Sequence, residues 1–176
     1  ILDRIFRGEL AAGERLPSIG ELARTHGMSA ASAREAIQKL ALMGLIQIRQ
    51  GEGTFLDENI PSILEILEAR KYVEMATSLL ASRNATKKEL QELDALIAEM
   101  RDAYRREDTA TYTQLDLAFH LAIGRMSKNA LLAAFLVNIQ DLLHYLQQRT
   151  HMLQGTLEQA NRYHPLIAEA IRDRKP

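Results

Sequence analysis

The sequence predicts a mainly α-helical protein with two parts: an N-terminal winged helix-turn-helix and a C-terminal antiparallel all-α helical bundle. Aromatic residues make up only 5% of the 176 residues, while Ala and Leu are abundant, and this composition favours helices. Apolar residues alternate with polar ones, as in a strand, only after Gly44. From Ile63 onward, the apolar residues recur with helical spacing.

The first part is expected to hold three helices. The first covers Ile1–Phe6 and ends before Gly8 and Gly13. Ser18 followed by Glu21 forms a capping box, which predicts a second helix running to His26. Gly27 suits the left-handed conformation that ends such a helix.

A third helix and a hairpin complete this part. Ser29 is a good N-cap for a helix from Ala30 to about Met43. Two strands, 45–49 and 54–56, flank a Gly-rich turn and predict a β-hairpin, the wing. The apolar face of the third helix is expected to comprise Ala33, Ala36, Ile37 and Leu40.

The outward face of the third helix is a candidate DNA contact surface. Residues up to Asp57 include seven basic and seven acidic side chains, so any affinity for DNA has to come from local placement of charge. A helix N-terminus supplies free amides to phosphates, and an Arg nearby can bind guanine. On pattern alone, an ordinary solvated face explains the same residues. The candidate contacts are Ser18, Ser29, Ser32, Arg34, Lys39, Arg49, Gln50 and Gly51.

Residues 8–56 resemble the GntR family of winged-helix regulators. The resemblance implies binding to double-stranded operator DNA, with Arg34 in the major groove and Gly51 approaching the minor groove. It also implies a homodimer that reads a short palindrome. The family often has Arg where this chain has Gly20 and Ala30, which predicts an altered operator. The matching stretches are Gly8–Leu10, Gly13–Ser18, Glu21–Ala23, Gly27–Ser29, Arg34–Ile37, Gly44–Ile46 and Gly51–Phe55.

The two parts are predicted to span residues 1–57 and 63–176, joined by the short linker 57–62. Short loops between the bundle helices favour antiparallel packing. Thr86 and Glu89 form a second capping box. The helices are expected at Ile63–Asn84, Lys87–Arg106, Thr109–Arg125, Asn129–Leu153 and Leu157–Arg172.

Asp116 and His120 are candidate metal ligands, because residues four apart share one face of a helix. His164, placed at the start of the last helix, is a third candidate. An Asp/His pair at this spacing is also common as a hydrogen-bonded core pair. His26, His144 and His151 have no such partner and are interpreted as surface or packing residues.

Most of residues 64–173 resemble the FCD ligand-binding domain of FadR-type GntR regulators. The resemblance rests on Glu68–Arg70, Glu74, Leu80–Thr86, Asp116, Phe119–His120, Asn129 and His164–Ile171. It implies a divalent metal ion, zinc or similar, held by Asp116, His120 and His164, with a fourth ligand on a helix beyond Pro176. It also implies a small carboxylate effector, and Arg70 and Asn129 are predicted to contact it. The stretch Glu68–Arg70 resembles regulators of lactate, pyruvate or glycolate metabolism. Pro165 is unusual for these relatives, but the first turn of a helix tolerates proline.

Other classes of protein fit the sequence less well. The chain has no Cys, no stretch long enough to span a bilayer and no export leader, which predicts a cytoplasmic protein. A metalloenzyme would need a general base, a nucleophile motif or a phosphate loop, and none is recognisable. The remaining alternative is a metal-free acyl or sugar sensor attached to the same winged helix. We therefore expect a ligand-responsive repressor or activator, not an enzyme.

Overall fold

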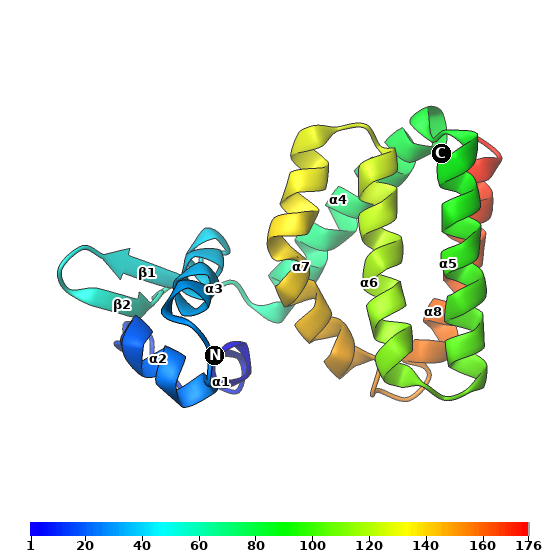
Figure 1. Cartoon of the computed structure of the whole chain (residues 1–176). Coiled ribbons are helices and arrows are strands. Elements are labelled where there is room, and N and C mark those ends of the chain that lie inside the picture. The colour runs from blue at the N-terminus through cyan, green and yellow to red at the C-terminus, as the bar shows by residue number, and fades with distance from the viewer. Residues whose placement is uncertain (176) are drawn as a thin grey trace. The chain divides into compact units, whose positions relative to one another are not determined.

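The computed structural model describes residues 1–175 and divides into two compact units (Figure 1). The first unit is Ile1–Glu68, and the second begins at Ala69. The boundary lies within the first turns of α4 (Ile63–Asn84), a few residues after the predicted linker. In the described residues, no helix is long and apolar enough to cross a membrane.

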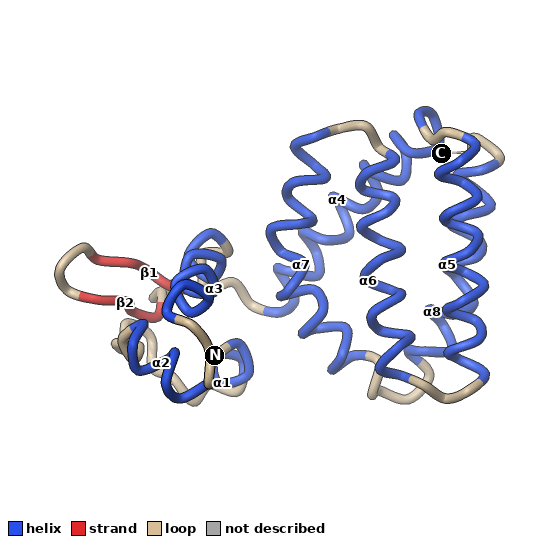
Figure 2. Tube along the Cα trace, in the orientation of Figure 1, coloured by secondary structure: helices blue, strands red, loops and turns tan. Residues whose placement is uncertain are grey.

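The first unit contains α1 (Leu2–Phe6), α2 (Ile19–His26) and α3 (Ala30–Leu42), followed by a hairpin of β1 (Ile46–Arg49) and β2 (Gly53–Leu56). The strands are antiparallel, with Ile46 opposite Leu56 and Arg49 opposite Gly53 (Figure 2). The predicted winged helix-turn-helix is therefore confirmed.

Helix capping explains where α2 and α3 begin. The Glu21 amide donates to the Ser18 hydroxyl at 3.3 Å, and the Ser18 amide donates to the Glu21 carboxylate at 2.8 Å. Gly27 ends α2 with φ of 62°, a conformation that costs an L side chain energy. Ser29 accepts from the Ser32 amide at 3.0 Å and so begins α3. These local bonds satisfy amides that a helix start leaves without partners.

The apolar face of α3 is narrower than predicted. Ala33, Ile37 and Leu40 are buried, whereas Ala36 is exposed. At about 100° per residue, Ala36 lies at the margin of the face that the other three define. The core of this unit also includes Ile5, Leu10, Leu16, Leu22, Leu45, Ile46 and Leu56.

The second unit contains α5 (Lys87–Arg105), α6 (Thr109–Met126), α7 (Ala130–Thr150) and α8 (Thr156–Arg172), together with most of α4. Helix α6 packs against both α5 and α7, and α8 packs on α5 (Figure 1). The prediction of an antiparallel bundle is confirmed, and the helix bounds differ from those expected by at most a few residues.

Close packing and a largely apolar core hold the bundle together. Gly124 allows α7 to approach α6, because a Cβ there would lie 2.8 Å from Leu136 Cδ1. Tyr112 and Phe119 are fully buried between the helices. They pack with Leu93, Met100, Ala103, Ile123, Met126, Ala168 and Ile171.

Pro165 lies in the middle of α8, which corrects the predicted position of His164–Pro165 at a helix start. Proline has no N–H, so the Asn161 carbonyl lacks its usual helical donor at this point. The helix begins at Thr156, nine residues before the proline, after Gly155, whose φ is 80°. The tolerance of a first turn for proline therefore does not apply here.

Candidate functional site

The N-terminal end of α3 presents an exposed surface. Arg34 is solvent-exposed one turn into the helix. The hydroxyls of Ser29 and Ser32 lie 2.9 Å apart, and Ser29 also caps the helix. The Ser18 hydroxyl donates to the Glu21 carboxylate at 2.7 Å, so it has a structural role in its own helix. Arg34 is thus the predicted contact with the longest reach from this end of α3.

The other predicted contact surface is the wing, the antiparallel hairpin of β1 and β2. Gly51 has φ of 81°, and nothing lies within 4 Å of the position that a Cβ would take. The Arg49 guanidinium stacks over the Phe55 ring, 4.6 Å from its centroid, and Gln50 is exposed. On α3, Lys39 pairs with Glu35 at 3.3 Å. The DNA contacts predicted for Lys39, Arg49, Gln50 and Gly51 stay predictions.

The second candidate site is a cluster of buried polar side chains inside the bundle. Asp116 and His120 lie one turn apart on α6, and His164 reaches them from α8. One potential ligand atom from each residue lies within 4.8 Å of the other two. The structure thus brings together the three predicted metal ligands.

The two histidines present the same ring nitrogen to one carboxylate oxygen. His164 Nε2 lies 3.1 Å from Asp116 Oδ1, and His120 Nε2 lies 3.8 Å from it. Asp116 Oδ1 is nevertheless buried without a hydrogen bond from any described residue. The other oxygen, Oδ2, accepts a hydrogen bond from the Gln147 side chain. An unsatisfied buried carboxylate oxygen facing two imidazole nitrogens is suited to a cation.

Glu74, on α4, holds the outer nitrogen of His120. Its Oε1 lies 3.1 Å from His120 Nδ1 and accepts from Arg70 Nε at 2.7 Å. Burial acts to raise the pKa of Glu74, but the neighbouring His120 and Arg70 lower it from 4.5 to about 2. Glu74 is therefore ionised, and His120 Nδ1 must carry a proton toward it.

His164 is held by its surroundings in a similar way. Its Nδ1 lies 3.4 Å from the Tyr112 hydroxyl, and its ring packs 4.8 Å from that of Phe119. Burial lowers the pKa of His164 to about 4, although Asp116 acts in the opposite direction. The neutral imidazole that a metal requires is thus the favoured form near neutral pH.

The structure adds residues to the cluster that sequence reasoning missed. His151, interpreted as a surface or packing residue, is buried with its Nε2 3.9 Å from Asp116 Oδ2. Glu74 and Gln147 also belong to the cluster. Glu74 appeared only within the stretches that carried the resemblance, and the other two lie far along the chain from Asp116. No local pattern would have joined them to it.

The two predicted effector residues have different environments. Arg70 is mostly buried, and it pairs with the Glu74 carboxylate that also holds His120, which places it beside the cluster. Asn129 is exposed and caps α7, accepting from the Leu131 and Leu132 amides at 3.1 and 3.2 Å. Asp116 lies about 15 Å before the end of α6, so the geometry gives no support to an effector contact by Asn129.

A winged helix-turn-helix followed by a helical bundle with a buried polar cluster defines a class of protein, a DNA-binding transcription regulator with an effector domain. The FCD domain family matches residues 65–176, and the family described as bacterial regulatory proteins, gntR family, matches residues 1–56. The chain belongs to the GntR family, in the FadR-type subgroup that carries an FCD domain. Its families and relatives are transcription regulators and not enzymes.

Known relatives and solved structures agree with this assignment. The HTH-type transcriptional regulator LutR of Bacillus subtilis is 30% identical over 165 residues, covering 85% of this chain and 74% of its own. A protein of Escherichia coli named for regulation of the L-lactate dehydrogenase operon is also 30% identical, covering 92% of this chain and 70% of its own. The structure of E. coli McbR/YncC aligns with a TM-score of 0.64 at 26% identity, covering 98% of this chain and 82% of its own.

Proposed function

We propose that this regulator senses a small organic acid through a divalent metal ion, zinc or similar, bound in its helical domain by Asp116, His120 and His164. In this proposal it acts in the cytoplasm as a homodimer on palindromic operator DNA. The observation that carries the metal site is the convergence of two imidazole Nε2 atoms on the buried, unsatisfied Asp116 Oδ1.

The donor set fits such an ion. Imidazole and carboxylate groups together suit zinc and similar first-row divalent metals. Metal-binding histidines usually donate their other ring nitrogen to an outer acceptor, and His120 has Glu74 in that place. A bound ion would supply a positive charge with open positions for the oxygens of a carboxylate ligand.

Arg70 is positioned to take the other side of an acidic effector. Its Nε is bonded to Glu74, and its remaining guanidinium nitrogens have no partner among the described residues. A guanidinium can bind a carboxylate through two parallel hydrogen bonds. The relative named for an L-lactate dehydrogenase operon supports a small hydroxy acid or keto acid as the effector class.

Exposed apolar side chains support self-association. Tyr72 and Met75 lie three residues apart on the same face of α4 and are 61% and 59% exposed. Exposed apolar residues that gather in one patch commonly mark protein interfaces. A dimer also matches the two half-sites that helix-turn-helix proteins read about one DNA turn apart.

Thermal unfolding tests the effector proposal. A ligand that binds only the folded state raises the unfolding midpoint according to its concentration and affinity. We expect one small hydroxy or keto acid from a panel to raise the midpoint, and we expect a chelator to remove that shift. If no acid shifts the midpoint and chelator has no effect, the proposal is wrong, and a metal-free acyl or sugar sensor becomes the better interpretation.

A further inference from the structure

His151 lies on the opposite side of the Asp116 carboxylate from His120 and His164. It is the C-cap residue of α7, and its side chain is 5% exposed. The ring Nδ1 lies 2.9 Å from Thr113 Oγ1, and Nε2 lies 3.9 Å from Asp116 Oδ2. The Tyr112 ring packs edge-on against it at 5.6 Å. The imidazole is thus fixed between a hydroxyl and a carboxylate.

The hydrogen bonds determine which nitrogen of His151 carries the proton. Thr113 Oγ1 donates its single proton to the Thr109 carbonyl at 2.8 Å. It therefore has only lone pairs for His151, so Nδ1 must be the donor in that bond. In the neutral ring, the lone pair then lies on Nε2 and faces Asp116 Oδ2. Asp116 Oδ2 accepts a hydrogen bond from the Gln147 side chain, but no proton lies between it and the Nε2 lone pair, so a cation close to both atoms would be favourable.

All three histidines share this arrangement. Each turns its Nε2 toward Asp116, while an outer residue contacts Nδ1. The outer residues are Glu74 for His120, Tyr112 for His164 and Thr113 for His151. Metal-bound imidazoles are usually held by such outer hydrogen bonds.

We propose that His151 is a further ligand, through Nε2, of the metal ion that Asp116, His120 and His164 bind. The inference rests on the proposed metal site. Two atoms bound to one ion at about 2.1 Å can lie at most about 4.2 Å apart. His151 Nε2 and Asp116 Oδ2, at 3.9 Å, satisfy this limit.

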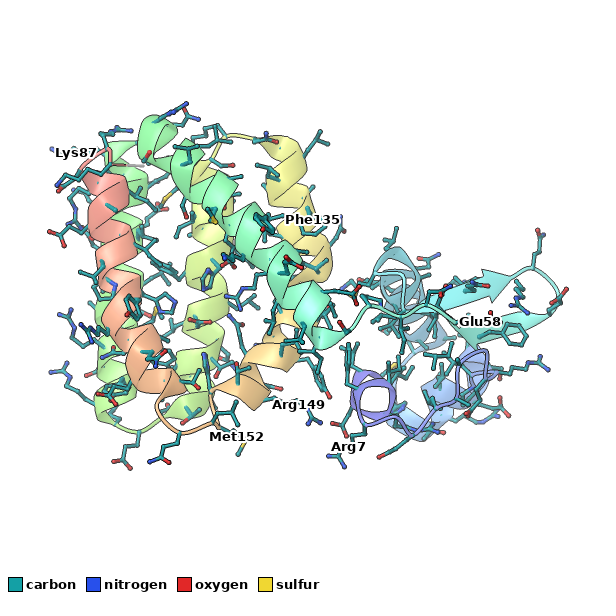
Figure 3. The ribbon with its side chains drawn as sticks, turned by 180° about the vertical axis from the view of Figure 1, so that it is seen from behind. Arg7, Glu58, Lys87, Phe135, Arg149 and Met152 are labelled. Carbon is teal, nitrogen blue, oxygen red and sulfur yellow. The ribbon has the colours of Figure 1, made fainter. Side chains whose placement is uncertain are left out.

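Binding to the same ion as His120 and His164 requires a small movement of His151. His151 is not among the three residues whose ligand atoms lie within 4.8 Å of one another, because it approaches the Asp116 carboxylate from the Oδ2 side. His151 follows the last residue of α7 and precedes the exposed loop 152–155. Figure 3 shows Met152, the next residue, pointing away from the bundle in this loop. The His151 amide still donates to the Gln147 carbonyl at 2.8 Å, and the chain leaves the helix directly after it.

His151→Asn separates a ligand role from a packing role. The Asn side-chain amide can take the place of Nδ1–H and still donate to Thr113, but it has no atom at the Nε2 position. We expect chelator-stripped His151→Asn to bind Zn²⁺ at least about tenfold more weakly than the unmodified protein in calorimetric titration. We also expect the visible absorption of the Co²⁺ form to change, because one nitrogen donor is lost. His26→Asn, on the exposed end of α2, is the matched control and should leave both measurements unchanged.

The outcomes separate the two proposals. Zn²⁺ affinity and a Co²⁺ spectrum like those of the unmodified protein in His151→Asn would overturn the role of His151 alone. Zn²⁺ binding by the unmodified protein that Asp116→Ala leaves intact would overturn the metal site itself. Loss of binding in both Asp116→Ala and His151→Asn, with His26→Asn unchanged, is the result that supports the inference.

Discussion

At the scale of single residues, side chains outside the proposed ligand set orient the residues of the buried cluster. Glu74 does not face Asp116, yet its carboxylate holds His120 Nδ1 and Arg70 Nε at the same time. His120 is thereby turned so that Nε2 faces Asp116. Glu74 thus links His120, a proposed metal ligand, and Arg70, the proposed effector contact, through one carboxylate. A residue outside the ligand set thus determines how both are oriented.

Replacing Glu74 should therefore weaken metal binding without removing a ligand. We expect Glu74→Ala to lower Zn²⁺ affinity by about 10–100-fold, because His120 loses the acceptor that orients its ring. Competition with a chromophoric chelator measures the affinity. Glu68→Ala, an exposed position on the same helix, should have no effect. Equal affinities for the two variants would show that His120 needs no help from Glu74.

At the scale of elements, α8 shows a conflict between local sequence and tertiary packing. Pro165 removes one backbone hydrogen bond from the helix interior, directly after the buried His164. The helix persists because Ala168 and Ile171 are buried in the bundle core with His164 one to two turns away. Burial of apolar side chains, each worth about 1.5–3 kcal/mol when large, can offset the cost of one proline.

Replacing this proline should stabilise the bundle. We expect Pro165→Ala to raise the free energy of unfolding by about 1–3 kcal/mol, because the Asn161 carbonyl regains a donor. Urea denaturation of the metal-free protein measures the change. Glu158→Ala, at an exposed position of the same helix, should stay within about 0.5 kcal/mol of the unmodified protein. A loss of stability in Pro165→Ala would mean that the native path of α8 depends on the proline.

At the scale of the whole molecule, DNA binding and effector sensing reside in separate compact units. The unit boundary lies within α4, the helix that carries both Arg70 and Glu74. One continuous helix therefore leads from the end of the winged-helix unit to the side chains beside the buried polar cluster. Because α4 continues across the unit boundary, the side chains at the cluster and the DNA-binding unit are joined by one helix.

The division into units predicts that one function can be removed alone. We expect Arg34→Ala to weaken specific operator binding by about 1–3 kcal/mol, because a base contact is lost. Its thermal shift with effector should be the same as that of the unmodified protein. Fluorescence anisotropy, with an operator fragment selected by the unmodified protein, measures the affinity. Arg101→Ala, exposed on α5, is the charge-matched control. Unchanged operator affinity in Arg34→Ala would refute the recognition-helix assignment.

The sequence by itself determined the elements and the family. Helical spacing, the caps at Ser18, Ser29 and Thr86, and the glycines of the wing all act over a few residues, so a linear pattern records them. The pair Asp116 and His120 is also predictable from a linear pattern, because a four-residue spacing within one helix places both residues on the same face. His164 was a third candidate in the sequence, and the resemblance to a family, not a local spacing rule, joined it to the pair.

Only the tertiary structure decided which distant side chains complete the cluster. Glu74, Gln147 and His151 come from α4 and α7, and they meet Asp116 only because the helices pack at particular rotations and heights. The helix range expected from periodicity already contained Pro165, and burial in the core explains why α8 continues through a residue that favours a helix break. Periodicity states which face of a helix is buried. It does not state which residue of a neighbouring helix that face will meet, because packing between helices depends on all of their side chains together.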